Sequence, residues 1–396
     1  MPSDPGPPPL REVLAVLEDL YPARWAQSWD AVGLVCGDPE QPVRRVLLAV
    51  DPVAAVVDEA LAFGADLLLV HHPLLLRPVT SVAATSAKGR VVHRLIGAGC
   101  ALHVAHTNAD AASPGVSDAL ATALGLRDLV PLQPLAGEAQ DTLVTFVPTA
   151  DAERVLDALA AAGAGRAGRY ERVAFAAPGT GTFTPLPGAR PAIGRVGERE
   201  DVAEVRLELT VPRALRVPVL AALRAAHPYE VPVASFTEQA GPDPVLGIGR
   251  VGELAAPEPL AAFAERVAAA LPATEQGVRV AGDPGAPVRR VAVCGGSGDS
   301  LFAEVRASGA DAYVTADLRH HPASEAREHG SGAREHSGGR GPALVDVAHW
   351  ASEWPWLPEA AARLRAGLAG RGSTVDLRIS TTRTDPWTSR IPSRGE

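Results

Sequence analysis

Two short motifs in the sequence place an imidazole and a carboxylate four residues apart. His106 precedes Asp110 at this spacing, and His349 precedes Glu353. Each motif directly follows an apolar run that is typical of a buried strand. If each motif opens a helix, its two side chains share one helical face and point at one spot. A helix cap or a surface ion pair has the same spacing, but two copies favour a pair of metal-binding motifs.

Two adjacent histidines, His71 and His72, add further candidate ligands. They follow the apolar run LLLV at 67–70 and precede Pro73, which ends the expected strand. Neighbouring side chains at a strand end can reach two metal ions that lie side by side. Histidines bonded to loop backbone would have the same sequence, so the pair alone is weak evidence.

A mixture of imidazole and carboxylate ligands suits zinc, iron, manganese, cobalt or nickel, and it leaves positions open for water. The ligand types do not select among these metals. A carboxylate offers two oxygens, so Asp110 or Glu353 can bridge two cations about 3.5–4 Å apart that share a hydroxide nucleophile. The sequence therefore predicts two divalent metal ions (Zn, Fe, Mn, Co or Ni) in each subunit.

The candidate ligands lie within an internal repeat. The sequence PVRRV at 42–46 recurs at 287–291, and Gly-Ala-Asp at 64–66 recurs at 309–311 with the same offset. Two matches at one offset indicate related segments, which should be identified before single motifs are weighed.

The repeat continues with small gaps toward the candidate ligands. His-His-Pro at 71–73 is matched with His-His-Pro at 320–322, and ALHVAH at 101–106 is matched with ALVDVAH at 343–349. Apolar runs alternate with helical patterns in both segments, which is typical of βαβ units with buried parallel strands. We therefore expect an α/β fold in which two related halves form one metal-binding core.

The domain organisation follows from where this pattern breaks. We expect the two halves of the core at 1–135 and 246–396, with an inserted domain at 136–245. The insertion has the strand and helix order β-α-β-β-α-β, which predicts a ferredoxin-like α+β domain. The Gly-, Ser- and Arg-rich segment at 326–342 is expected to be a solvated loop, and the tail after Arg378 is expected to be poorly ordered.

Composition excludes several classes of protein. With 396 residues, 46% of them hydrophobic and 21% charged, the chain should form two or three soluble domains. No apolar run approaches the roughly 20 residues that span a bilayer, and the N-terminus lacks the pattern of a signal peptide, so we expect a cytoplasmic protein without membrane contact. Three distant cysteines suggest reduced thiols. The net charge of −9 disfavours nucleic-acid binding.

A glycine-rich segment, CGGSGDS at 294–300, joins an expected strand to an expected helix. Glycines allow backbone N–H groups to approach an anion at a helix N-terminus, so a phosphate site is one interpretation. A tight turn without a ligand explains the segment equally well.

With these motifs assembled, the chain resembles the NIF-three-like family of dinuclear-metal-centre hexameric proteins, commonly labelled GTP cyclohydrolase 1 type 2 homologues. The resemblance covers nearly the whole chain. Its motifs here are WDAVGL at 29–34, HHPLLL at 71–76, AHTNAD at 105–110, GGSG at 295–298, ADAYVTADLRHH at 310–321 and VAHWASE at 347–353. Ala316 and Ala348 stand where the family usually has glycine, which leaves the candidate ligands intact.

This resemblance implies a specific site. It assigns the metal ligands to His71, His72, Asp110, His349 and Glu353. His106 and His321 match positions near the metals, and we expect them to act catalytically by moving protons, because imidazole titrates near neutral pH.

The inserted segment resembles the longer bacterial members of the family and a PII-like ferredoxin fold. The motifs that carry this similarity include GTGTFTP at 179–185 and HPYEVP at 227–232. Family members form toroidal homohexamers with the metal sites facing the interior, so a homohexamer is expected here too.

The family label implies a metal-dependent hydrolase acting on a small nucleotide-like substrate. On GTP, water would attack C8 of the guanine and open its imidazole ring, although no residue visibly encodes guanine specificity. The alternative is a non-catalytic metal-binding or regulatory ring whose PII-like insertion senses a small molecule.

Overall fold

The computed structural model divides the chain into two compact units, which are described separately. The larger unit combines Met1–Leu135 with Val245–Glu396, and the smaller unit is Ala136–Pro244. The structure describes residues 6–135, 137, 139–239, 245–328 and 341–392. Of the predicted loop at 326–342, residues 329–340 lie outside this described part of the chain.

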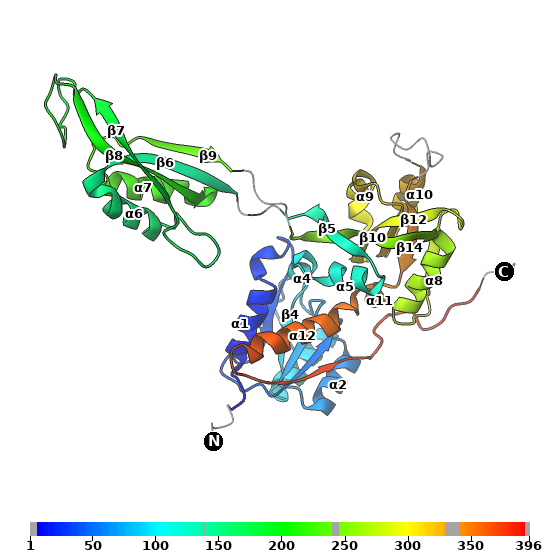
Figure 1. The fold of residues 1–396 in the computed structure, drawn as a ribbon. Helices are drawn as coiled ribbons and strands as arrows, with labels where there is room; N and C mark the ends of the chain where they lie inside the picture. Colours follow the sequence, from blue (N-terminus) through cyan, green and yellow to red (C-terminus); the bar gives the residue numbers. More distant parts are fainter. Residues whose placement is uncertain (1–5, 136, 138, 240–244, 329–340, 393–396) are drawn as a thin grey trace. The chain divides into compact units, whose positions relative to one another are not determined.

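The larger unit contains a five-stranded sheet in the order β1-β4-β3-β2-β15, parallel except for β1 (Figure 1). Alternate side chains of its central strands face opposite sides, so α1 and α12 pack on one face while α2 and α3 pack on the other. The elements are β1 (Gly33–Cys36), β2 (Arg45–Ala49), β3 (Leu67–Val70), β4 (Ala101–Val104), β15 (Asp376–Ile379), α1 (Leu10–Leu20), α2 (Ala54–Phe63), α3 (Ala87–Gly97) and α12 (Trp356–Ala369).

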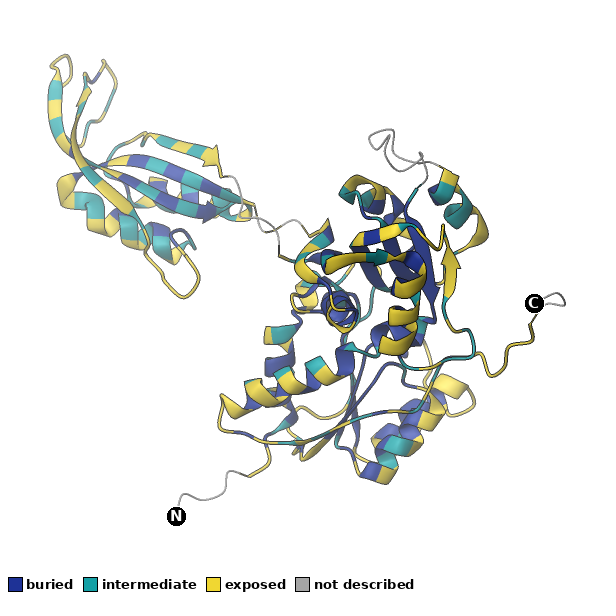
Figure 2. Ribbon diagram, turned by 45° about the vertical axis from the view of Figure 1, so that its right-hand side comes forward, coloured by how far each residue is buried: buried dark blue, intermediate teal, exposed yellow. Residues whose placement is uncertain are grey.

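A second, six-stranded sheet of the same unit has the order β11-β14-β13-β12-β10-β5. Helices α5 and α8 pack on one face, and α9 and α10 pack on the other. Figure 2 shows the central strands of both sheets buried and the outer faces of the helices exposed. The elements are β5 (Arg127–Pro134), β10 (Gly247–Pro259), β11 (Arg279–Ala281), β12 (Pro287–Ser297), β13 (Ala312–Ala316), β14 (Ala343–Val347), α5 (Val116–Ala123), α8 (Leu260–Ala270), α9 (Phe302–Ser308) and α10 (His320–Glu328).

Two helices of five residues follow strand ends in this unit, and short 3-10 turns occur in both units. The helices are α4 (Thr107–Ala111) and α11 (His349–Glu353), and the 3-10 turns are Ala23–Trp25, Thr149–Asp151, Arg213–Leu215 and Asp299–Leu301. Within the described residues, no helix is long and apolar enough to cross a membrane.

The backbone register corrects one part of the predicted repeat. Val46 of β2 pairs with Leu67 of β3, and Val291 of β12 pairs with Ala312 of β13, at the offset seen in the sequence. Both pairs of strands are parallel. The backbone register therefore aligns β3 with β13 without reference to residue identity.

Along this alignment, Ala316 and Asp317 occupy the positions of His71 and His72. The predicted match with His320–His321 is wrong, because that pair comes later and begins α10. Asp317 has a positive φ of 56°, which turns the chain away from the strand. Matching identical residue types misaligned the two segments. The structural equivalent of the His71–His72 pair is Ala316–Asp317, which contains no histidine.

The C-terminal segment after β15 differs from the expectation of poor order. Arg378 itself lies in β15, and the residues that follow make specific contacts. The hydroxyl of Thr382 donates to Glu59 at 2.7 Å, and the hydroxyl of Thr384 donates to Asp51. Hydroxyl groups that reach distant carboxylates leave no periodic pattern, which is why the sequence did not indicate these contacts.

The smaller unit has a four-stranded antiparallel sheet in the order β7-β8-β6-β9, with two helices on one face. In chain order its elements alternate as strand, helix, strand, strand, helix, strand. They are β6 (Gln140–Pro148), α6 (Ala152–Ala161), β7 (Phe175–Phe183), β8 (Glu200–Pro212), α7 (Arg216–Ala226) and β9 (Ala234–Glu238).

A buried arginine joins the N-terminal and C-terminal segments of the larger unit. Arg250 of β10 is 1% exposed, and its guanidinium lies 2.7 Å from the carboxylate of Asp118 in α5. It also donates to the carbonyl oxygens of Ala112, Gly247 and Gly249. These bonds satisfy a charge that would otherwise be buried at high cost.

We predict that Arg250→Met lowers the free energy of unfolding of this unit by about 3–5 kcal/mol, because it leaves Asp118 as an uncompensated charge. The control Arg266→Met removes a half-exposed ion pair with Glu258 and should cost less than about 1 kcal/mol. Urea unfolding followed by tryptophan fluorescence measures this unit, since all six tryptophans lie in it. Equal effects of the two substitutions would contradict the assigned role.

Candidate metal centre

Four histidine rings lie together at the ends of strands from both sheets of the larger unit. His71 and His72 directly follow β3, and His106 follows β4 as the N-cap of α4. His349 follows β14 and opens α11. The ring centroids are 5.0 to 5.1 Å apart between His71 and His72, His71 and His106, and His72 and His349. The two sheets thus contribute to one site.

Each of these rings is held through its Nδ1 atom by an oxygen acceptor at 2.5 to 2.9 Å. Such a bond fixes the ring orientation and leaves Nε2 as the atom available to a metal. The acceptors are the Ala105 carbonyl for His71, Asp51 for His72, Asp30 for His106 and Asp317 for His349.

The carboxylate of Glu353 lies among three of the Nε2 atoms. Its Oε1 is 3.0 Å from His349 Nε2 and 3.5 Å from His71 Nε2, and its Oε2 is 3.1 Å from His72 Nε2. The residue is 3% exposed. A carboxylate with both oxygens directed at different imidazoles is suited to bridge two cations.

The donor atoms of this site fit a metal better than they fit one another. His72 Nε2 and His349 Nε2 lie 3.2 Å apart, where two lone pairs would repel unless a proton or a cation lies between them. His71 Nε2 and Glu353 Oε2 are buried and make no hydrogen bond with any residue that the structure describes. Such unsatisfied atoms cost about 1–3 kcal/mol each, which a bound cation would offset.

In the part of the chain that the structure describes, two groups of three residues have ligand atoms within 4.8 Å of one another. One group is His71, His72 and His106, and the other is His72, His349 and Glu353. Asp110 belongs to neither group, although its Oδ1 is 3.7 Å from His71 Nε2.

The structure thus brings the sequence-predicted ligands together within the larger unit, and it also places His106 within reach of a metal. His321 is exposed at the start of α10 and belongs to neither group of potential ligands among the described residues.

Protonated imidazoles compensate the negative charge of the buried Glu353 carboxylate. Burial disfavours a charged imidazole at His72, but Glu353 and the hydrogen bond with Asp51 outweigh burial and raise the pKa of His72 to about 11. Burial likewise opposes charge at His349, where Glu353 and Asp317 raise the pKa to about 10. Burial alone would raise the pKa of Glu353, but the surrounding imidazoles hold it well below its usual range. A metal ion that bound to these imidazoles would therefore displace protons.

The glycine-rich segment approaches the centre closely. Gly296 has a φ of +69°, and a Cβ atom there would lie 2.6 Å from Glu353 Oε1. Its N–H donates to Ser352 Oγ at 2.8 Å, and the N–H of Gly295 donates to Ser117 Oγ at 3.3 Å. Because these amides already have partners, the geometry at both glycines supports a tight turn rather than a phosphate cradle.

Comparison with known proteins identifies the family of the chain. The family model described as Duf34/NIF3 (NGG1p interacting factor 3) matches residues 8–386. The chain belongs to the Duf34/NIF3 family. The GTP cyclohydrolase 1 type 2 homolog of Mycobacterium tuberculosis is 52% identical over 379 residues, which cover 96% of each chain. The homolog of Streptomyces coelicolor is 41% identical over 386 residues, covering 98% of this chain and 96% of the relative.

Solved structures show the same fold. A Bacillus cereus protein related to NIF3 is 35% identical, with a TM-score of 0.71 over 96% of this chain and 99% of that one. Staphylococcus aureus protein SA1388 is 28% identical, with a TM-score of 0.79 over 97% of this chain and 99% of that one. The mixed α/β architecture with several sheets is therefore that of the Duf34/NIF3 family.

Three carboxylates that orient the histidines were missed from the sequence. Asp51 lies two residues after the end of β2, and Asp317 directly follows β13, so a search for acidic residues near strand ends would have found both. Asp30 lies in the WDAVGL motif, which carried the family resemblance without a role being assigned to it.

We predict that Asp51→Asn weakens metal binding by about 10–100-fold, because the neutral amide no longer supports the charge and orientation of the His72 ring. Asp58→Asn is the matched control, since Asp58 is an exposed residue paired with Arg94. Competition with a chelating dye measures both affinities. Unchanged affinity in the Asp51 variant would show that this hydrogen bond does not support the centre.

The two histidine-carboxylate motifs should differ in their contribution to metal binding. We predict that His349→Ala loses at least one ion, because His349 lies against Glu353. His106→Ala should keep near-normal metal content, because His71, His72 and Asp110 remain in place beside it. Elemental analysis of the purified variants measures the content. Equal metal loss would make His106 a required ligand.

Proposed function

We propose that this protein is a dinuclear-metal-dependent hydrolase that acts on a nucleotide-like substrate in the manner of a GTP cyclohydrolase 1 type 2. The observation that carries this proposal is the buried Glu353 carboxylate among imidazoles from two sheets. The names of its relatives, GTP cyclohydrolase 1 type 2 homologs, support the substrate class.

The residues proposed to hold the two ions combine imidazole nitrogens and carboxylate oxygens, a set that suits Zn, Fe, Mn, Co or Ni. They are His71, His72, Asp110, His349 and Glu353. When bound, the ions would supply Lewis acidity and lower the pKa of coordinated water.

His106 is proposed to move a proton at this site. Burial would raise the pKa of Asp30, but hydrogen bonds from His106 and Thr107 outweigh it and lower that pKa, so Asp30 stays ionised and orients the His106 ring. A base held by an orienting carboxylate is a common arrangement in proton transfer. His321 is retained as a second proposed proton carrier on the family resemblance alone.

An exposed aromatic side chain supports a substrate with a flat base. Trp29 is 54% exposed and lies edge-on to His106, with ring centroids 5.9 Å apart. Its Nε1 donates to Gln27 at 2.6 Å, which limits its rotation. A held indole beside the proposed metal centre offers a stacking surface for a nucleobase.

A second candidate function is a non-catalytic metal-binding or regulatory ring that responds to a small molecule. A cavity in the smaller unit, described below, favours this alternative. Both functions include the proposal that the protein is a cytoplasmic homohexamer. Light scattering on the purified protein tests the number of subunits.

Turnover by metal-loaded protein decides between the two functions. The protein is loaded separately with each of the five metals and incubated with GTP, ATP and a phosphodiester, and the products are analysed by mass spectrometry. We expect ring-opened product from GTP, loss of turnover in Glu353→Gln, and a reduction of about 10²–10⁴-fold in His106→Ala.

Glu265→Gln is the matched control, since Glu265 is exposed on α8. Absence of turnover of every substrate, by protein with verified metal content, would reject the hydrolase and leave the non-catalytic ring.

A further inference from the structure

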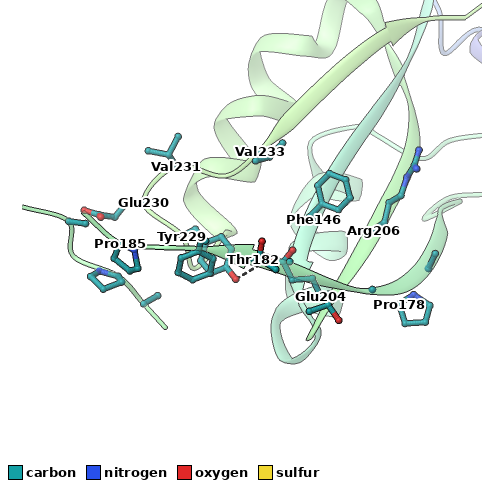
Figure 3. Close-up of a pocket in the computed structure, with 18 residues that line it drawn as sticks. Phe146, Pro178, Thr182, Pro185, Glu204, Arg206, Tyr229, Glu230, Val231 and Val233 are labelled. Carbon is teal, nitrogen blue, oxygen red and sulfur yellow. Dashed lines mark hydrogen bonds between the residues drawn. The ribbon is translucent and has the colours of Figure 1, made fainter. Parts of the chain in front are cut away.

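The smaller unit contains a cavity of about 690 Å³ between β7, β8 and the loop after α7 (Figure 3). This volume lies within the range of small-molecule sites, about 300–1,000 Å³. Its walls are largely aromatic and aliphatic. The lining residues that matter to the argument are Phe146, Phe183, Glu204, Tyr229, Val231 and Val233.

Two of the motifs that carry the resemblance of the inserted segment meet at this cavity. GTGTFTP at 179–185 supplies the end of β7, and HPYEVP at 227–232 supplies the loop after α7. A Cβ atom on Gly181 would lie 2.1 Å from Glu204 Oε2, so only glycine lets that carboxylate lie against β7. Glycine weakens a strand, and its presence in one often marks such a close approach.

The carboxylate of Glu204 is buried with little compensation. The residue is 8% exposed, and its Oε1 accepts a hydrogen bond from the Tyr229 hydroxyl at 2.8 Å (Figure 3). Among the described residues, no cation forms an ion pair with it. Arg206, which also lines the cavity, instead donates to Glu208 at 2.9 Å. A buried carboxylate is stable only when it is well paired, so this one lacks a cationic partner.

The tyrosine that reaches Glu204 is itself held in place. The N–H of Tyr229 donates to His227 Nδ1 at 3.1 Å, so the proton of His227 lies on Nε2, which donates to the Phe146 carbonyl at 2.8 Å. Burial and the nearby Glu204 raise the pKa of Tyr229, so its hydroxyl remains a donor. Its ring contacts Phe183 edge-on, with centroids 5.4 Å apart. The polar corner of the cavity is therefore preorganised.

We propose that this cavity binds an organic cation, an ammonium group carried on an aromatic or aliphatic body, with the ammonium against Glu204. The aromatic walls add a favourable cation–π interaction. Val231 and Val233, which are 84% and 60% exposed, provide apolar surface for the body of the ligand. An anion is disfavoured, because Glu204 is the charged side chain of the lining that has no oppositely charged partner among the described residues. The other two lining charges are paired, Arg206 with Glu208 and Glu230 with Arg190.

Three indole compounds of similar size test the role of charge. They are tryptamine, which is a cation, tryptophol, which is neutral, and indole-3-propionate, which is an anion. Binding to the full-length protein is measured by calorimetry, so the result does not depend on metal-site turnover. We expect tryptamine to bind at least 10-fold more tightly than tryptophol, and indole-3-propionate not to bind. No tryptamine binding, or equal binding of tryptamine and tryptophol, would overturn the proposal.

Variants locate the binding to Glu204. Glu204→Gln should weaken tryptamine binding at least 10-fold, and Gly181→Ala should do the same by displacing the carboxylate. Glu153→Gln is the control, since Glu153 is an exposed residue on α6 paired with Arg172. Circular dichroism melting checks that each variant is folded. Wild-type affinity in a folded Glu204→Gln variant would refute the assigned site.

Discussion

The carboxylate of Glu353 is the group on which the architecture of the larger unit converges. It is buried at the end of α11, among imidazoles that come from the other sheet and from its own helix. Burying such a charge is unfavourable unless positive charge surrounds it. The two sheets meet at these strand ends, because His71 and His72 follow β3 of one sheet and His349 follows β14 of the other. The buried Arg250 joins β10 to α5, so the N-terminal segment of the chain is tied to the second sheet.

The outer hydrogen bonds extend this constraint to distant parts of the chain. Asp51 accepts from His72 on one side and from the Thr384 hydroxyl on the other, so the C-terminal segment takes part in orienting a ring at the end of β3. Asp317 holds His349 from the end of β13. A metal ligand that is fixed at Nδ1 cannot rotate away, and the site is thus preorganised by residues that need not touch a metal.

The sequence predicted the features that depend on local spacing. The strands before His71 and His349 and the short helices that follow His106 and Ala348 form where periodicity and the four-residue spacing indicated, and the family is confirmed. The pairing of each orienting carboxylate with its histidine could not be predicted in this way, although Asp51 and Asp317 stand near strand ends. The bond between Asp30 and His106 joins residues far apart in the chain, and only the backbone register reveals that Asp317 stands in the place of a histidine. Long-range pairing of this kind leaves no local pattern.

Both units contain a buried glutamate that lies against a glycine, but the two glutamates have different surroundings. In each, a glycine lets a buried glutamate lie against the backbone, Gly296 beside Glu353 and Gly181 beside Glu204. The surroundings of the two carboxylates then decide their chemistry. Glu353 faces several imidazoles, which can carry protons or hold a metal ion, whereas Glu204 faces one tyrosine hydroxyl and apolar walls. The first set of neighbours can compensate the charge from within the protein. The neighbours of Glu204 cannot compensate its charge. This shortage of positive charge makes the smaller unit a candidate receptor for an external cation.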